Sequence, residues 1–490
     1  MGIVDILASI AKVLPEVKAP ERPPQAKERL MWTGIALVLF FFMYHITVFG
    51  VQISFAGIDF LQTITASRIG SLLTTGIGPL VLSSIFLQLF VGAGLIKLNL
   101  QDKKDKQKFQ EAQKVLAIVL ALVEGGIFAS TALSGSIISV GGLSYEVMMA
   151  IVVIQIALGS VAMLYLDEIV SKYGIGSGIS LFIAAGVSQA IIGGLIALIF
   201  GETNSVIAAL TGGGAESISR ALLVLLPFFF TVIVFLVVVF AEGIKVEIPL
   251  AFNRMRGMAP KLPLKFFYVS NIPVIFAAAL MLNVQIFAGG LLFNANHYDQ
   301  NGILNITHVE NDIISKYIGF VDNQNRLRDG FLYLISPINA QGQDLIGFWQ
   351  GFLLTAETPV NHIPEWVHAV VYILFLSFAC ILFGMFWTET ANMDAKSVTN
   401  QLISSGVQIP GFRRDPRMIE SILSKHIFPL TVLGSFSVGL LAGVADLTGA
   451  LGSGTGILLT VGIFYRMYEQ IEQMNMFEMY PGLGKFIGEE

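Results

Sequence analysis

The sequence predicts an all-α polytopic membrane protein with ten transmembrane helices in two pseudo-symmetric inverted halves of five. Three observations lead to this fold class. Of the 490 residues, 54% are hydrophobic and only 13% are charged, against roughly 25% charged residues in an ordinary soluble domain. Apolar stretches of membrane-spanning length recur ten times along the chain. Lysine and arginine are concentrated in alternate loops, as the positive-inside rule requires.

The expected spans are stretches of about 20 mainly apolar residues, which suffice to cross ~30 Å of hydrocarbon. They lie near residues 31–49, 74–96, 115–133, 146–166, 177–200, 221–241, 268–288, 367–388, 427–445 and 450–468. The segment 51–67 is too short and too polar to span, which predicts a re-entrant half-helix. Such a segment is tolerated at membrane depth only where it is buried in protein or lines a water-filled cavity. It is therefore the first place to look for function.

The basic residues set the orientation of the spans. With the N-terminus in the cytoplasm, 24 of the 29 Lys and Arg residues fall on the cytoplasmic side and 5 on the outside. We therefore expect a multi-pass protein of the cell membrane with both termini cytoplasmic. The large basic loops recur at comparable places in the two groups of five spans. Topology alone thus predicts an inverted pair of halves, an arrangement common in membrane proteins.

The expected organisation follows from these spans. Residues 1–30 form a cytoplasmic amphipathic segment and not a cleavable signal, because no long apolar core with a small-residue cleavage site is present. The remaining units are an N-terminal half (31–200) with the re-entrant segment at about 51–73, an external linker (201–220), a C-terminal half (221–470) with a long external loop at about 289–366, and a cytoplasmic tail (471–490).

The sequence holds no enzyme, cofactor or metal motif in a usable context. The single cysteine, Cys380, excludes disulfides within the chain and cysteine-based metal sites. Two Gly-x-Gly-x-Gly runs, at 174–178 and 452–456, lead into membrane spans and do not follow strands, so a dinucleotide site is not predicted. The six histidines form no metal-ligand pair at helical spacing.

Two function classes other than a channel are considered for a protein of this topology. A secondary solute transporter would fit the inverted halves, but it would be expected to carry more carboxylates at the membrane midplane. Glu124 lies midway along the third span, whereas Asp446 and Arg466 lie near span ends. A purely structural membrane scaffold is a weaker alternative. The discriminating feature is the midplane, where paired carboxylates or unwound carbonyl cages would favour solute transport and apolar rings would favour a channel.

Several segments, in order over nearly 410 residues, together resemble the SecY family of protein translocase channels, most closely its archaeal members. They are Gln62–Ile69, Gly76–Pro79, Ser83–Leu89, Leu166–Ile169, Lys172–Ser180, Val246–Pro249, Tyr268–Ile275, Ile409–Arg413, Gly454–Leu459 and Tyr465–Gln470. The long external loop before the eighth span departs from the family pattern. The resemblance implies a channel that passes unfolded polypeptides across the membrane and releases hydrophobic segments sideways into lipid.

The resemblance also implies how the pore is closed. A plug would close the outer funnel; its residues are Gly57, Ile58, Asp59, Phe60, Leu61, Gln62, Thr63, Ile64, Thr65, Ala66, Ser67 and Arg68. A ring of apolar side chains would line the waist; its residues are Ile77, Val81, Ile175, Ile179, Ile275 and Leu459. Ile77 and Val81 are four residues apart and so share a helix face, as do Ile175 and Ile179. An apolar ring blocks ions by dewetting, yet it can deform around a passing chain.

The resemblance further implies a lateral gate and several partners. Glu124 and Asn283 would be polar contacts at a seam between the second–third and seventh–eighth spans. Two basic cytoplasmic loops would dock the ribosome, because arginine meets RNA phosphates electrostatically; the docking residues would be Arg254, Arg256, Lys261, Arg413, Arg414 and Arg417. Further partners would be small membrane subunits resembling SecE and Sec-beta, signal sequences, nascent polypeptides and membrane lipid. No cofactor and no metal are implied.

Overall fold

The computed structural model describes most of the chain between residues 3 and 479. The residues that it leaves undescribed in this range are 23, 53–65, 93, 97, 99–101, 131–132, 134–135, 139–141, 202–204, 213–216, 250, 253–260, 270, 293–311, 322–326, 339–348, 350–351, 353–356, 405–406 and 409–415.

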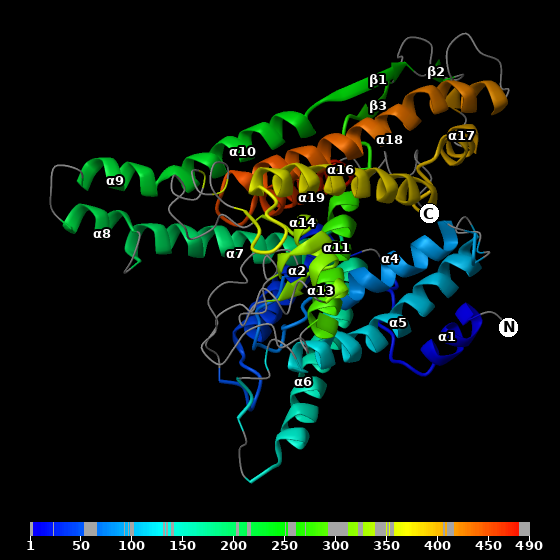
Figure 1. The fold of residues 1–490 in the computed structure, drawn as a ribbon. Helices are drawn as coiled ribbons and strands as arrows, with labels where there is room; N and C mark the ends of the chain where they lie inside the picture. Colours follow the sequence, from blue (N-terminus) through cyan, green and yellow to red (C-terminus); the bar gives the residue numbers. More distant parts are fainter. Residues whose placement is uncertain are drawn as a thin grey trace.

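The first part of the chain forms one short helix and five longer ones. These are α1 (Ile3–Ala11), α2 (Ala26–His45), α4 (Gly78–Gly92), α5 (Lys103–Ser130), α6 (Tyr145–Tyr173) and α7 (Gly178–Phe200). Helix α1 packs along the N-terminal part of α5 (Figure 1). Lys114 on α5 fixes the segment that follows α1, because its Nζ lies 2.6 Å from Glu168 Oε1 and donates to the carbonyl of Pro15 at 2.8 Å.

The second part of the chain is also predominantly helical. Its helices are α8 (Val206–Thr211), α9 (Ser217–Val224), α10 (Leu226–Glu242), α11 (Ile272–Leu292), α13 (Ile313–Tyr317), α14 (Gly330–Leu334), α16 (Glu365–Thr390), α17 (Ala395–Ser404), α18 (Pro416–Leu447) and α19 (Gly454–Met479). Helices α8 and α9 pack against each other and project together from the body (Figure 1).

The strands of the described residues are short. Strand β1 (Lys245–Pro249) pairs antiparallel with β3 (Lys261–Lys265). Strand β2 (Ala251–Phe252) pairs with β6 (Val407–Gln408), and β4 (Phe320–Val321) pairs with β5 (Leu327–Asp329). The first two pairs connect the ends of α10, α11, α17 and α18 (Figure 1).

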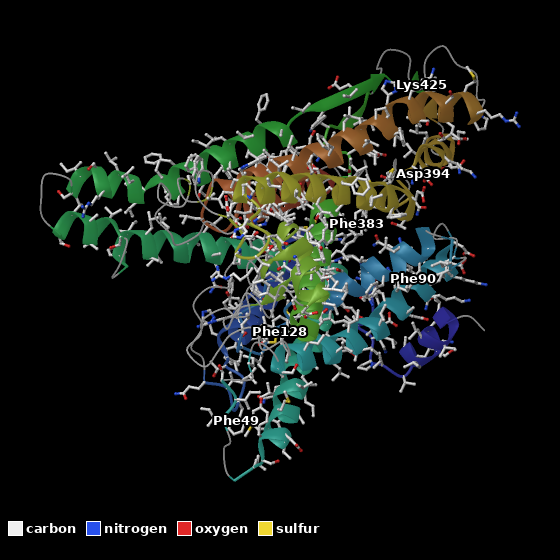
Figure 2. The ribbon with its side chains drawn as sticks, viewed as in Figure 1. Phe49, Phe90, Phe128, Phe383, Asp394 and Lys425 are labelled. Atoms are coloured by element: carbon white, nitrogen blue, oxygen red, sulfur yellow. The ribbon has the colours of Figure 1, made fainter. Side chains whose placement is uncertain are left out.

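The helices have the length and composition of membrane spans. Six are long and apolar enough to cross a bilayer, and two shorter apolar helices, Gly78–Gly92 and Ile272–Gln285, accompany them. Each of the ten expected spans overlaps a helix of the structure, while the count of ten crossings stays a prediction. Many large apolar side chains point outward, for example Phe49 and Phe90 (Figure 2). The predicted class of a helical, multi-pass membrane protein is confirmed.

Glycine allows helices α16 and α18 to pack closely against each other. A Cβ at Gly384 would lie 2.1 Å from Ser435 Oγ, and a Cβ at Gly439 would lie 2.7 Å from Ser377 Cα. Small residues are common at such contacts in membranes. Lipid is as apolar as the helices themselves, so helices associate through close packing and not through the hydrophobic effect. The same pair of helices is joined by a hydrogen bond from Tyr372 to Asp446.

The described part of the long loop between α11 and α16 is a small folded unit. Asp329 is fully buried, and its carboxylate accepts from the backbone amides of Gly330, Val360 and Asn361. The unit docks on the first turn of α16, where Tyr333 donates to Glu365 at 2.7 Å. Burial, together with this bond to the carboxylate, raises the pKa of Tyr333. The hydroxyl therefore remains a donor at neutral pH.

Candidate functional site

The predicted ring residues come from four places in the chain, and the structure buries all but one of them. Ile77 and Val81, at the start of α4, are 2% and 3% exposed, and Leu459 on α19 is fully buried. These three residues and Ile275 on α11 belong to the same large apolar cluster, and Ile179 packs against it while partly exposed. Ile175 is 2% exposed. The structure therefore places four of the six predicted ring residues in the large apolar cluster that runs through the helical body.

The turn before α7 positions the two ring residues Ile175 and Ile179. The amide of Ile175 donates to Thr33 Oγ1 of α2 at 3.1 Å, and the amide of Ile179 donates to Asp167 Oδ1 of α6 at 2.8 Å. A Cβ at Gly178 would lie 2.5 Å from Asp167 Cα. Glycine is therefore needed at this position for α6 and the start of α7 to approach.

A different turn positions Ile77. Gly76 has φ +53°, a left-handed conformation that glycine adopts without a steric penalty. The amides of Leu80 and Val81 then donate to the carbonyl of Ile77, each at 3.1 Å. This arrangement starts α4 directly at the ring residue.

The predicted lateral-gate residues are buried on two helices that contact each other, α5 and α11. Glu124 is 1% exposed and Asn283 is 2% exposed. A Cβ at Gly78 would lie 2.9 Å from Glu124 Oε2, so α4 and α5 meet at this carboxyl group. Within the described residues, Glu124 Oε1 and Asn283 Oδ1 each have no hydrogen-bond partner. The two helices thus carry one unpaired polar oxygen each.

Most of the predicted plug, residues 57–65, lies outside the described residues. Its last residues are placed inside the body: Ala66 is fully buried and Ser67 is 3% exposed, while Arg68 stacks over the ring of Tyr44 with 5.9 Å to the centroid. The following residues run between helices α2 and α6. A Cβ at Gly159 would lie 1.9 Å from the carbonyl oxygen of Leu72.

The predicted docking loops are described in part. Arg254, Arg256, Arg413 and Arg414 lie outside the described residues. Lys261 begins β3, and Arg417 is an exposed residue in the first turn of α18. The pairing of β2 with β6 connects the two loops directly. Sequence reasoning missed this connection, because the strands are two residues long and 155 positions separate the paired residues Phe252 and Val407.

A partly buried tyrosine stabilises the base of these loops. Tyr268 donates to the carbonyl of Met393 at 2.7 Å, linking the segment before α11 to the turn between α16 and α17. The bond thus fixes the start of α11 against the turn that leads into α17.

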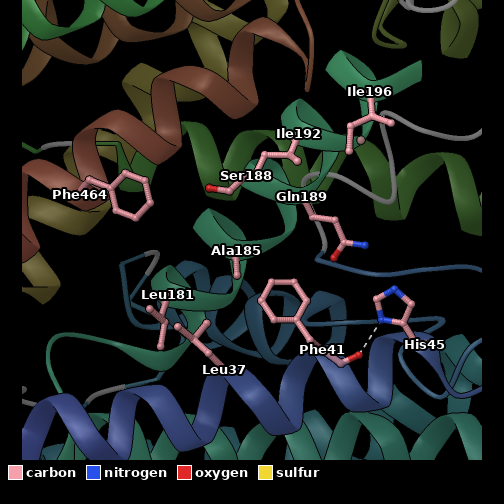
Figure 3. Close-up of a pocket in the computed structure, with 11 residues that line it drawn as sticks. Leu37, Phe41, His45, Leu181, Ala185, Ser188, Gln189, Ile192, Ile196 and Phe464 are labelled. Carbon is pink, nitrogen blue, oxygen red and sulfur yellow. Dashed lines mark hydrogen bonds between the residues drawn. The ribbon is translucent and has the colours of Figure 1, made fainter. Parts of the chain in front are cut away.

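The described residues offer no metal centre, since none of their His, Cys, Asp and Glu side chains form a group of three or more suited to a metal ion. One opening among the described residues is of another kind. It is a groove of about 570 Å³ on the outside of the helical body, between α2, α7 and α19 (Figure 3). Its walls are apolar, including Phe41, Ile192 and Phe464, and Gln189 and His45 lie toward one end.

Comparison with known proteins gives consistent matches along the chain. The SecY family model matches residues 71–468. The protein translocase subunit SecY of Methanocaldococcus jannaschii is 41% identical over 486 residues, which cover 98% of this chain and 99% of that protein. A solved structure of a protein-conducting channel is similar with a TM-score of 0.77 and 40% identity, covering 99% of this chain and 100% of that one. Sec61 in the canine ribosome–channel complex from the endoplasmic reticulum is similar with a TM-score of 0.75 and 39% identity, at the same coverage.

Proposed function

This chain belongs to the SecY family and is a protein-conducting channel, and we propose that the six ring residues close its pore at rest. The observation that supports this role is burial in one large apolar cluster, to which Ile77, Val81, Ile275 and Leu459 contribute from three separate helical regions. A constriction without polar groups excludes ions by dewetting. We assign the chain no enzymatic activity, and we do not favour the transporter alternative, since its relatives are translocases.

Opening sideways requires a seam between helices, and we place it where α4 and α5 meet α11 and α16. Helix α11 contacts α4, α5 and α16, and α16 also contacts α4. Glu124 and Asn283 are the polar side chains on two of these helices that retain unpaired buried oxygens. Unpaired polar atoms cost free energy when buried, and in this proposal the two oxygens gain partners when the seam opens. The segment at about 51–73 serves as the plug, tied to the body at Ala66–Arg68.

The two basic loops form one docking surface for the ribosome in this proposal. The β2–β6 pairing connects them, and together they carry the six predicted docking cations. Sec61, which is 39% identical to this chain, is found in a ribosome–channel complex. Clustered arginine and lysine bind RNA phosphates with release of counterions. The same loops lie in the cytoplasm if both termini are cytoplasmic, as the charge distribution favours.

The groove between α2, α7 and α19 suits a small single-span partner, resembling SecE, that clamps the two ends of the chain together. Its lining combines helices from the first and last parts of the sequence. Nearby, α10 also exposes large apolar side chains such as Phe229 and Phe240. A second small subunit resembling Sec-beta, together with signal sequences and nascent chains, completes the proposed set of partners.

The ring is tested by changing Ile77, Ile179 and Ile275 together to asparagine in the complex reconstituted with its small subunits. Polar side chains hydrate a dry constriction, so the resting ion conductance in planar bilayers should rise. The demand for a strongly hydrophobic signal sequence should relax, because the closed state loses stability relative to the open one.

The matched control places asparagine at Ile154, Leu158 and Leu374, which point outward from α6 and α16. This triple variant adds the same polarity to the lipid-facing surface and should leave conductance at the parent value. If the ring variant, correctly inserted and partnered, conducts no more than the parent, the six residues do not form the gate.

A further inference from the structure

Two turns far apart in the sequence share the run Gly-Ser-Gly and the backbone conformation of its first glycine. Residues 175–180 read Ile-Gly-Ser-Gly-Ile-Ser, and residues 451–456 read Leu-Gly-Ser-Gly-Thr-Gly. Gly176 has φ +75° and Gly452 has φ +76°. Each turn follows a long helix, α6 or α18, and each starts the next helix, α7 or α19.

A threonine from a third helix holds the beginning of each turn. Thr33 on α2 donates its hydroxyl proton to the carbonyl of Arg29 at 2.8 Å, and its Oγ1 accepts from the amide of Ile175 at 3.1 Å. Thr231 on α10 repeats this pattern in the second turn. It donates to the carbonyl of Pro227 at 2.7 Å and accepts from the amide of Leu451 at 2.9 Å.

An aspartate near the end of the preceding helix holds the other end of each turn. Asp167 Oδ1 accepts from the amide of Ile179 at 2.8 Å. Asp446 Oδ1 accepts from the amide of Thr455 at 2.9 Å. In both turns the two captured amides are four positions apart, and a Cβ on the glycine between them, Gly178 or Gly454, would lie 2.5 Å from an atom of the aspartate.

Each pair of side chains therefore clamps three helices together. The first clamp joins α2, α6 and α7, and the second joins α10, α18 and α19. The first residues of a helix lack partners for their amides, and a carboxylate near these amides also interacts favourably with the helix dipole. Thr33, Thr231 and Asp446 are buried, so water does not readily replace their bonds.

We propose that Thr33 and Asp167 are positioning residues for the pore ring, because the amides that they hold belong to Ile175 and Ile179 themselves. Thr231 and Asp446 act in the same way on α19, where Thr455 lies one helical turn before Leu459. The two clamps fix the position of the ring side chains along the pore and their orientation. Without the clamps, the glycine-rich turns would allow several backbone conformations. This inference rests on the proposed function of the ring.

The test compares Thr33→Val with Thr33→Ser in the complex reconstituted with its small subunits. Valine preserves the shape of the side chain but removes the acceptor, and leaving one buried amide unpaired is expected to raise resting conductance roughly tenfold. Serine keeps the hydroxyl group and should restore conductance to near the parent value. Thr399→Val is the control, since Thr399 is buried but its hydroxyl bonds within its own helix, to Ala395.

Amide hydrogen exchange gives a local measurement that does not depend on channel activity. Thr33→Val should accelerate exchange in residues 174–180 and leave residues 450–456 unchanged, and Thr231→Val should do the reverse. Asp167→Leu should act like Thr33→Val, whereas Asp167→Asn, which retains a side-chain oxygen, should be milder. A valine variant that accelerates exchange equally in both turns would indicate general destabilisation and would overturn the positioning role.

The outcomes separate this inference from the proposed function. One outcome is that the ring variant raises resting conductance while Thr33→Val, assembled normally, conducts like the parent. In that case the ring residues form the gate, but the clamp does not position them. If the ring variant itself fails to conduct, the proposed gate fails, and the positioning role fails with it. If the ring variant and Thr33→Val both increase conductance, and Thr33→Ser restores the parent value, the results support both the proposed gate and the positioning role.

Discussion

Tyr372 on α16 donates a hydrogen bond of 2.7 Å to Asp446 Oδ2 on α18, and the same carboxylate accepts from the amide and hydroxyl groups of Thr455 on α19. One carboxylate thus joins three helices in the second part of the chain. Tyr372 is 1% exposed and Asp446 is 4% exposed, so water cannot substitute for a lost partner.

This relationship predicts that Tyr372→Phe destabilises the channel without opening it. Removing the hydroxyl group leaves the carboxylate with its threonine bonds, and buried polar pairs between membrane helices contribute on the order of 1 kcal/mol. The thermal unfolding midpoint of the detergent-purified complex should fall measurably. Tyr468→Phe is the control, because Tyr468 is 63% exposed, and it should leave the midpoint unchanged. A midpoint equally lowered in both variants would contradict the specific role of the Tyr372 bond.

The orientation of the chain can be tested by labelling single cysteines with an impermeant thiol reagent in a Cys380→Ser background. His362, whose side chain is 75% exposed, should label from outside as His362→Cys. Ser404, exposed at the end of α17, should label as Ser404→Cys only after the membrane is opened. The 24-to-5 distribution of basic residues is the physical reason. Labelling of the Ser404 variant in intact cells would contradict the ten-span arrangement.

The docking surface predicts a salt-dependent defect. Reversing the charges of Arg254 and Arg413 to glutamate should weaken ribosome binding to the reconstituted complex, most strongly at low ionic strength, because phosphate contacts are screened by salt. Assembly with the small subunits should be intact. Lys12, an exposed basic residue near the N-terminus, gives the matched control when reversed. Unchanged ribosome binding at low salt would leave the loops with a role in topology only.

The ion pair of Lys114 with Glu168 predicts how the N-terminal segment is held. Lys114 is 11% and Glu168 is 20% exposed at the side chain, and Lys114 also binds the carbonyl of Pro15. Lys114→Met should release residues 12–22, because a partly buried pair of this kind contributes ~1 kcal/mol. Limited trypsin digestion at Lys12 and Lys18 should become faster. The exposed Lys106 serves as the control, and equal digestion of the Lys114→Met and Lys106→Met variants would show that the pair does not fasten the segment.

The fold class and the family could be predicted from the sequence, because both depend on properties that are local in the chain. Apolar length determines which segments can span a bilayer, and each expected span overlaps a helix. The short motifs around the glycine-rich turns identified the SecY family, a prediction that the comparisons confirm. Burial of Ile77, Val81, Ile275 and Leu459 in one cluster also agrees with the predicted ring, although its role as a gate stays a prediction.

The hydrogen bonds that hold this site could not be predicted from sequence, because they join residues far apart in the chain. Thr33 and Ile175 are 142 positions apart, and Thr231 and Leu451 are 220 apart. A threonine in an apolar span has no local pattern that identifies its partner. The repeated Gly-Ser-Gly of the two turns was visible in the sequence, but only the bonds to Thr33, Asp167, Thr231 and Asp446 showed that both turns are built alike. The sequence by itself determined which segments enter the membrane, whereas the tertiary structure decided which backbone amides are captured, since that depends on three helices meeting at one point.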